Sequence, residues 1–141
     1  LGIVNNEIKY KAEIRKDYGD TPPVKCSSLR LGQVFINLFV NAAQAIEDKG
    51  IIGIKTYAKN NEVYVAISDT GKGIAPENIN QIFDPFFTTK PIGQGTGLGL
   101  SVSYEIVKNH GGMIMVDSKV GAGTTFTVML PSHSAVNLHP N

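Results

Sequence analysis

The sequence has little of several residue types that mark other classes of protein. Its 141 residues include a single cysteine and no tryptophan. One thiol, Cys26, cannot form an internal disulfide, which favours a reducing compartment, and no second cysteine is available to build a metal cluster with it. The 13 basic and 12 acidic residues give a formal net charge of +1. This balance supplies neither a broad basic field for nucleic acid nor a polybasic patch for a membrane surface.

Long apolar runs and a secretory signal are also missing. No run approaches the roughly 18 apolar residues that span a bilayer, and the N-terminus lacks a charged-then-apolar pattern. We therefore expect a soluble, cytoplasmic chain. Because it begins at Leu1 without a methionine, we expect a fragment of a longer protein, whose parent is either soluble or anchored in a membrane.

Two familiar nucleotide-binding signatures are absent as well. There is no G-x-x-x-x-G-K-[ST] phosphate loop, and the dense glycine run at residues 93–99 follows a predicted loop instead of a strand. Any nucleotide must therefore be bound by a different arrangement of residues.

The residues that are present suffice for one domain, because 42% of the chain is apolar. Periodic patterns predict a strand, a long helix, two strands, a short helix, a loop, a second helix and two strands, over residues 10–18, 29–49, 51–59, 62–68, 76–82, 83–99, 98–109, 113–118 and 124–130. Ser27 or Ser28 is the expected N-cap of the long helix and Gly50 its stop, while Asn60-Asn61 is the expected hairpin turn. The predicted fold class is α/β, a two-layer sandwich of a mixed, mostly antiparallel five-stranded sheet covered on one face by about three helices.

The long helix carries one narrow polar stripe. Apolar residues cover most of its circumference, but at about 100° per residue five polar side chains fall within roughly 80° of one another. These are Gln33, Asn37, Asn41, Gln44 and Asp48. Each would cost on the order of 1–3 kcal/mol if buried without a partner, so they must meet water, other side chains or a ligand. The stripe is either the floor of a site or a wet seam.

Two glycine-rich segments favour the site. Asp69-Thr70-Gly71-Lys72-Gly73-Ile74 directly follows a strand, where a carboxylate accepts from an exocyclic amine and glycine lets a flat ring approach the backbone. An ordinary Asp-x-Gly turn is the alternative. The second segment contains glycines at 93, 95, 97 and 99, the last of which opens a helix. Backbone N–H groups there suit phosphate oxygens, although a flexible loop has the same composition.

Taken together, four stretches resemble the asparagine box, first glycine box, phenylalanine box and second glycine box of sensor histidine kinases: Q-V-F-I-N-L-F-V-N-A-A-Q-A-I, D-T-G-K-G-I, I-F-D-P-F-F-T-T-K and G-Q-G-T-G-L-G-L-S. With G-A-G-T-T-F-T-V-M-L-P at the end, residues 10–131 resemble the catalytic ATP-binding domain of these kinases, most closely the nitrogen-regulation type. The resemblance implies the Bergerat-type fold shared by gyrase, the heat-shock chaperone and mismatch-repair ATPases. Residues 1–9 would then remain from the connection to a missing helical domain, and residues 132–141 would form a polar tail.

The resemblance also implies roles for individual residues. Asn41 matches the family's Mg²⁺ ligand, and Asn37, one turn earlier, would contact metal-bound water or phosphate. Asp69 matches the adenine-binding carboxylate, and Thr124, rather than Thr125, resembles the threonine that reaches adenine through a water. The residues implied to bind ATP or Mg²⁺ are Asn41, Gln44, Asp69, Gly71, Gly73, Ile74, Phe87, Thr88, Lys90, Gly95, Thr96, Gly97, Leu98, Gly99 and Thr124. Those implied to be catalytic are Asn37, Asn41 and Lys90.

One position departs from the family pattern. Many histidine kinases carry Lys or Arg where this chain has Gln44, which leaves a phosphate contact unfilled. We hypothesise that Lys90, in the segment that the family uses as a lid, supplies the missing charge. Phe83 and Phe87 bracket that lid, and for Phe83 a core position is the better interpretation.

Asn37 also bears on the type of reaction. Hydrolysing members of the superfamily carry a glutamate there that activates water, whereas an amide cannot accept that proton. We therefore predict slow hydrolysis and transfer of the γ-phosphoryl group to a histidine on a separate phosphoacceptor domain. His110 precedes Gly-Gly at a helix end and His133 and His139 lie in the tail, so none has the expected phosphoacceptor context.

Two alternatives remain at this point. One is an ATPase of the same superfamily that uses lid closure to drive dimerisation, and the other is a non-catalytic nucleotide-binding interaction module. For the favoured kinase, the implied partners are the helical phosphoacceptor domain of a parent homodimer and, downstream, a response regulator.

Overall fold

The computed structural model describes residues 12–19, 28–47, 49–85, 87 and 99–132. In chain order its elements are β1 (Ala12–Tyr18), α2 (Ser28–Ala45), β2 (Gly50–Lys59), β3 (Glu62–Asp69), α3 (Pro76–Ile79), α4 (Gly99–Asn109), β4 (Met113–Lys119) and β5 (Gly123–Pro131). Within these residues, none of the helices combines the length and the apolar character that a bilayer crossing requires.

The strands form one five-stranded sheet in the order β1-β2-β3-β5-β4. β1 runs parallel to β2 because α2 connects them, and the other neighbouring pairs are antiparallel. The β2–β3 turn uses Asn60 and Asn61 with φ of 54° and 64°, the left-handed conformation that asparagine tolerates. The predicted mixed, mostly antiparallel sheet and its hairpin turn are confirmed.

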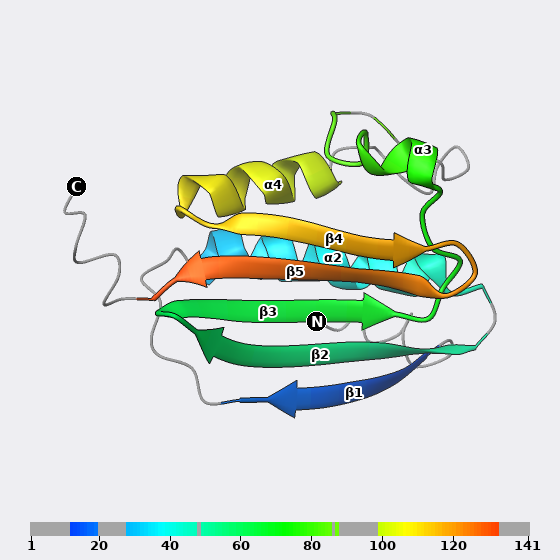
Figure 1. The fold of residues 1–141 in the computed structure, drawn as a ribbon, viewed down its shortest axis with the longest axis horizontal. Helices are drawn as coiled ribbons and strands as arrows, with labels where there is room; N and C mark the ends of the chain where they lie inside the picture. The colour runs from blue at the N-terminus through cyan, green and yellow to red at the C-terminus, as the bar shows by residue number, and fades with distance from the viewer. Residues whose placement is uncertain (1–11, 20–27, 48, 86, 88–98, 133–141) are drawn as a thin grey trace.

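The core lies between the sheet and α2, which passes behind the strands in Figure 1 and contacts β3 and β5. The buried residues of α2 recur at helical spacing, as the sequence pattern predicts: Leu31, Val34, Leu38, Ala42, Ala43 and Ile46. They meet inward-facing residues of the strands, among them Ile52, Ile67, Phe126 and Val128. α4 packs against both α2 and β4. The helices therefore cover one face of the sheet, as predicted.

The long helix ends at Ala45 and not at Lys49, and Gly50 begins β2 instead of stopping the helix. The reason is a competing hydrogen bond, since the Ala45 carbonyl accepts from the backbone N–H of Lys72 at 3.1 Å. Ser28 is already helical and is therefore not the N-cap, while Ser27 lies outside the described residues.

Other boundaries differ from the prediction by a few residues. α3 stops at Ile79 and is followed by turns and a bend over residues 80–85, and α4 begins at Gly99. Ser132 is not part of an exposed tail, because it is 1% exposed and its backbone N–H donates to the Asn61 carbonyl at 3.0 Å. The described part of the domain thus continues one residue beyond the predicted end.

Leu38→Ala should lower the free energy of unfolding by about 2–5 kcal/mol, because Leu38 is 0% exposed between α2 and the sheet and its loss leaves a cavity. Ile36→Ala is the matched control on the same helix, where the side chain is 40% exposed and the loss should stay below about 1 kcal/mol. Urea denaturation of both variants measures the difference. Equal losses would contradict the assignment of the buried face.

Candidate functional site

One row of polar side chains crosses three strands at one end of the sheet. Asp69 of β3 pairs in register with Thr124 of β5, which pairs with Ser118 of β4. Side chains alternate along a strand, so this row lies on the helix-covered face with Ile67 and Phe126. Asp69 is 7% exposed and Thr124 is 5% exposed. A buried carboxylate and hydroxyl therefore stand side by side under the helical layer.

Burial raises the pKa of Asp69 above its ordinary value, and the backbone N–H groups of Gly71 and Thr124 act in the opposite direction. The Gly71 N–H donates to Asp69 Oδ1 at 2.9 Å. A desolvated carboxylate without a cationic partner among the described residues is costly to the fold, and such groups are often kept for a ligand.

The segment Asp69–Ile74 is tied to both layers of the fold. Its Lys72 N–H donates to Ala45 at the end of α2, and its Ile74 N–H donates to Ser118 Oγ at 2.8 Å. The two glycines of this segment have a steric reason, because a Cβ at Gly71 would overlap the Ala45 carbonyl and a Cβ at Gly73, whose φ is +77°, would overlap the Lys119 carbonyl. The Asp-x-Gly-x-Gly pattern is therefore explained by backbone packing on two sides.

On the helix side, Asn37 joins α2 to the first turn of α4. Its Nδ2 donates to the Gly99 carbonyl at 3.3 Å and to Ser103 Oγ at 3.2 Å, while Ser103 Oγ donates to the same carbonyl at 2.8 Å. Because a carbonyl can only accept, these bonds fix which end of the Asn37 amide faces α4. The remaining group, Oδ1, is left for other partners.

The polar stripe of α2 thus changes character along its length. Gln33 is exposed, Asn37, Asn41 and Gln44 are half-buried, and Asp48 lies outside the described residues. Gln44 Oε1 is buried and has no hydrogen-bond partner among the residues that the structure describes. An unpaired buried acceptor costs about 1–3 kcal/mol, so this end of the stripe has room for a donor that the described residues do not supply.

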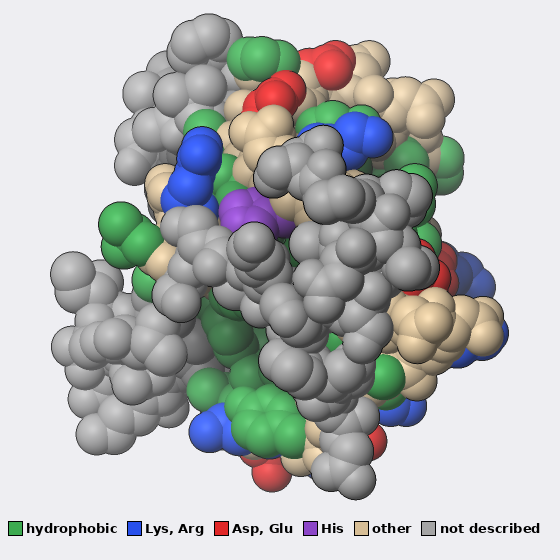
Figure 2. Space-filling view, turned by 90° about the vertical axis from the view of Figure 1, so that its left-hand side faces the viewer, with side chains coloured by type: hydrophobic (Ala, Val, Ile, Leu, Met, Phe, Trp, Pro, Cys, Tyr) green, Lys and Arg blue, Asp and Glu red, His purple; other side chains and the backbone are tan. Residues whose placement is uncertain are grey.

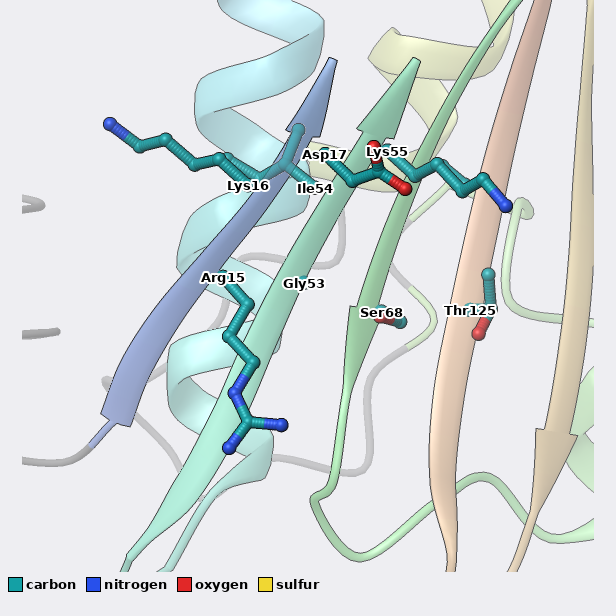
Figure 3. Close-up of a pocket in the computed structure, with 9 residues that line it drawn as sticks. Arg15, Lys16, Asp17, Gly53, Ile54, Lys55, Ser68 and Thr125 are labelled. Atoms are coloured by element: carbon teal, nitrogen blue, oxygen red, sulfur yellow. The ribbon is translucent and has the colours of Figure 1, made fainter. Parts of the chain in front are cut away.

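The opposite face of the sheet carries a separate feature. Arg15, Asp17, Lys55, Ser68 and Thr125 line a shallow hollow of about 330 Å³ there (Figure 3). Thr125 points to this face, as the strand alternation predicts. Both signs of charge line the hollow, and on the face drawn in Figure 2 the basic and acidic side chains are likewise interspersed. On these two surfaces the described residues therefore give an anionic ligand no broad basic area, so local groups would have to hold it.

Residues 26–134 match the model of a protein family described as histidine kinase-, DNA gyrase B- and HSP90-like ATPases. The chain belongs to this ATPase family. The sensor histidine kinase ZraS of Escherichia coli K12 is 44% identical over 120 residues, which make up 84% of this chain and 25% of ZraS. The sensor kinase CckA of Brucella abortus is 42% identical over 135 residues, covering 84% of this chain and 14% of CckA. The chain therefore spans a quarter or less of the length of these curated relatives.

Solved structures give the same family. The catalytic domain of the histidine kinase ThkA superposes with a TM-score of 0.81 at 33% identity, over 93% of this chain and 86% of that one. The mycobacterial sensor histidine kinase MprB gives a TM-score of 0.79 at 28% identity, over 93% of this chain and 90% of that one. The resemblance to the catalytic domains of sensor histidine kinases is confirmed, and the ATPase family implies ATP as the ligand.

In this member of the family, the structure brings some of the predicted site residues together. Asn37 and Gly99 are hydrogen-bonded, Asp69 and Thr124 are neighbours, and the segment with Gly71, Gly73 and Ile74 is bound to the end of α2. Asp69 and the amides of α2 therefore lie on the same side of the sheet. The predicted residues that lie outside the described part of the chain are Thr88, Lys90, Gly95, Thr96, Gly97 and Leu98.

The structure also shows where Phe83, Phe87 and His110 lie. Phe83 is a core aromatic, with its ring 5.3 Å from Tyr104 and 6.4 Å from Phe126, as expected. Phe87 also packs against the core. His110 Nδ1 bonds to the Ile106 carbonyl at 2.8 Å, so this histidine caps α4, as its position before Gly-Gly predicts.

Sequence reasoning missed two serines of the site. Ser103 is 0% exposed, and its place on the apolar stripe of α4 beside Ile106 and Val107 was the available signal. Ser118 bonds to both Ile74 and Thr124, but only the strand register shows it. No local pattern in the sequence identifies that register.

At pH values above the raised pKa of Asp69, the Asp69→Asn variant should be at least as stable as the wild-type chain, because the substitution removes a buried charge. A carboxyl whose pKa is raised in the folded state stabilises the fold at low pH. This stabilisation is lost as the pH rises from the ordinary pKa of 3.8 through the pKa of the folded state. The two proteins should therefore converge as the pH falls through this window. Thermal melts between pH 3 and pH 8 measure this, and a wild-type protein that gains stability relative to the variant with rising pH would contradict it.

Proposed function

We propose that this chain is the catalytic domain of a sensor histidine kinase, which binds Mg·ATP and passes its γ-phosphoryl group to a histidine on a separate helical domain. The observation that carries the proposal is the state of Asn37, whose amide nitrogen is committed to Gly99 and Ser103. An amide held in this way cannot take a proton from water, so the site favours positioning of ATP over its hydrolysis. The kinase names of the relatives support the same conclusion.

The residues in place fit a magnesium nucleotide. Asp69 and Thr124 offer oxygens to an exocyclic amino group of adenine, and Asn41 on α2 offers a hard amide oxygen to Mg²⁺, which fills its remaining positions with phosphate and water. The unpaired Oε1 of Gln44 is an acceptor for such a metal-bound water. Bound Mg²⁺ would neutralise charge on the phosphoryl oxygens. We assign the other predicted contacts, which lie between Phe87 and Gly99, to the phosphate side of the site.

The proposal extends to the rest of the signalling protein. The parent chain would be a cytoplasmic or membrane-anchored homodimer that supplies the phosphoacceptor histidine, and a response regulator would receive the phosphoryl group. The site itself would face the cytoplasm, where ATP is available.

Asn41→Ala should abolish transfer. The test mixes this chain with the helical phosphoacceptor domain of its own parent and labelled Mg·ATP, and measures label on histidine. We expect label with the wild-type chain and a loss of about 100-fold or more with Asn41→Ala, because the metal ligand is removed. Gln33→Ala, at an exposed position of the same stripe, is the matched control and should transfer normally.

The same mixture distinguishes the alternatives. Rapid release of inorganic phosphate without labelled histidine would support the dimerising ATPase. Saturable ATP binding with neither product would support the interaction module. Either result would overturn the kinase proposal.

Lys90→Ala should weaken ATP binding and slow transfer by about tenfold, because Gln44 carries no positive charge and a charged hydrogen bond to phosphate would be lost. Lys55→Ala, in the hollow on the opposite face of the sheet, is the control for a general change in charge. Calorimetric titration with Mg·ATP and the transfer rate measure both. Unchanged affinity and rate for Lys90→Ala would dispose of this role.

A further inference from the structure

Ser118 lies beside the candidate base site, and the proposed function gives it no role. It stands at the β4 end of the cross-strand row that begins with Asp69 and continues through Thr124. It is half-buried, and its hydroxyl contacts three different groups. The directions of these three hydrogen bonds follow from the number of protons available.

The first two directions are fixed by chemistry. The backbone N–H of Ile74 can only donate, and it donates to Ser118 Oγ at 2.8 Å. The Gly123 carbonyl can only accept, so in its 3.1 Å contact with Ser118 Oγ the serine hydroxyl must be the donor. While Ser118 makes this bond, it has no proton left for its third contact.

That third contact joins Ser118 Oγ to Thr124 Oγ1 at 2.7 Å. With the Ser118 proton already placed, this contact is a hydrogen bond only if Thr124 donates. The opposite direction would give up the bond to Gly123, so the complete set requires the Thr124 proton to point at Ser118. Thr124 then turns only lone pairs toward the site.

The neighbouring Asp69 has the same character. When ionised, a carboxylate only accepts, and one of its oxygens already accepts from Gly71. Two adjacent side chains thus offer acceptors and no donor. A water that donates to both of them has used both its protons, so it would also present only a lone pair to the base.

We propose that Ser118 is a positioning residue that sets the Thr124 hydroxyl as an acceptor and so makes the site select a nucleobase with an exocyclic amino group over one with a carbonyl at that position. The proposal rests on the proposed nucleotide function and adds the residue that fixes its selectivity. Ser118 also holds the Ile74 backbone, so a purely structural role must be separated from this one. A structural role affects both kinds of base equally, whereas the proton arrangement affects their ratio.

The test titrates this chain with Mg·ATP and with Mg·ITP, whose base carries a carbonyl in place of the amino group. The wild-type chain should prefer ATP by about tenfold or more, because a carbonyl facing two acceptors stays unpaired. Ser118→Ala should reduce that preference by about five- to tenfold, since the freed Thr124 hydroxyl can then donate to the carbonyl.

Two further comparisons sharpen the result. Ser118→Thr and Ser118→Val have nearly the same shape and differ by the hydroxyl, so the preference should survive in the first and fall in the second, even if the alanine variant fails to fold. In a Thr124→Val background, Ser118→Ala should leave the ATP/ITP ratio unchanged, because no hydroxyl remains to redirect.

Equal weakening of ATP and ITP binding by Ser118→Val, with the ratio unchanged, would overturn this inference and leave the proposed function intact. Equal affinity of the wild-type chain for ATP and ITP would do the same. Absence of any saturable binding of ATP to the folded wild-type chain would instead overturn the proposed function itself. A thermal melt of each variant confirms that the folded protein is being measured.

Discussion

The hydrogen bond from the Lys72 N–H to the Ala45 carbonyl is the constraint on which the site depends. It joins the segment after β3 to the last turn of α2, and it leaves no room for a side chain at Gly71. The same bond takes the carbonyl that a longer helix would need, so α2 stops where the site begins. Because sheet and helix are connected at this point, Asp69 and the amides of α2 face one region.

That region keeps polar groups that the fold alone would not favour. Asp69 is nearly inaccessible to water and its pKa is raised by burial, while Gln44 holds an unpaired acceptor. Packed apolar side chains at these positions would cost the fold less. Their presence is therefore better explained by a ligand than by stability, and they occur at both the sheet side and the helix side of the site.

Much of this arrangement could be predicted from sequence, because its signals are local. Strand alternation, the apolar spacing of α2 and the Asn60-Asn61 turn each follow from neighbouring residues, and so does the motif that contains Asp69. The end of α2, the burial of Ser132 and the contacts of Ser118 depend on partners more than 25 residues away or across strands. Ser103 could be predicted only in part, since the sequence indicates its position on a helix but not its hydrogen bond to Asn37 on α2.

The contact between Asn37 and α4 links the chemistry of the site to the packing of its helices. The Gly99 carbonyl accepts from the Ser103 hydroxyl, and the Asn37 amide nitrogen donates to both that carbonyl and the Ser103 oxygen. A carboxylate in its place would bring no proton and would face the Gly99 carbonyl with negative charge. A carboxylate at position 37 would therefore lose the two hydrogen bonds that Asn37 donates to α4. The amide to which we assign slow hydrolysis thus also contributes hydrogen bonds between the two helices, so a change at position 37 acts on the proposed chemistry and on the α2–α4 contact together.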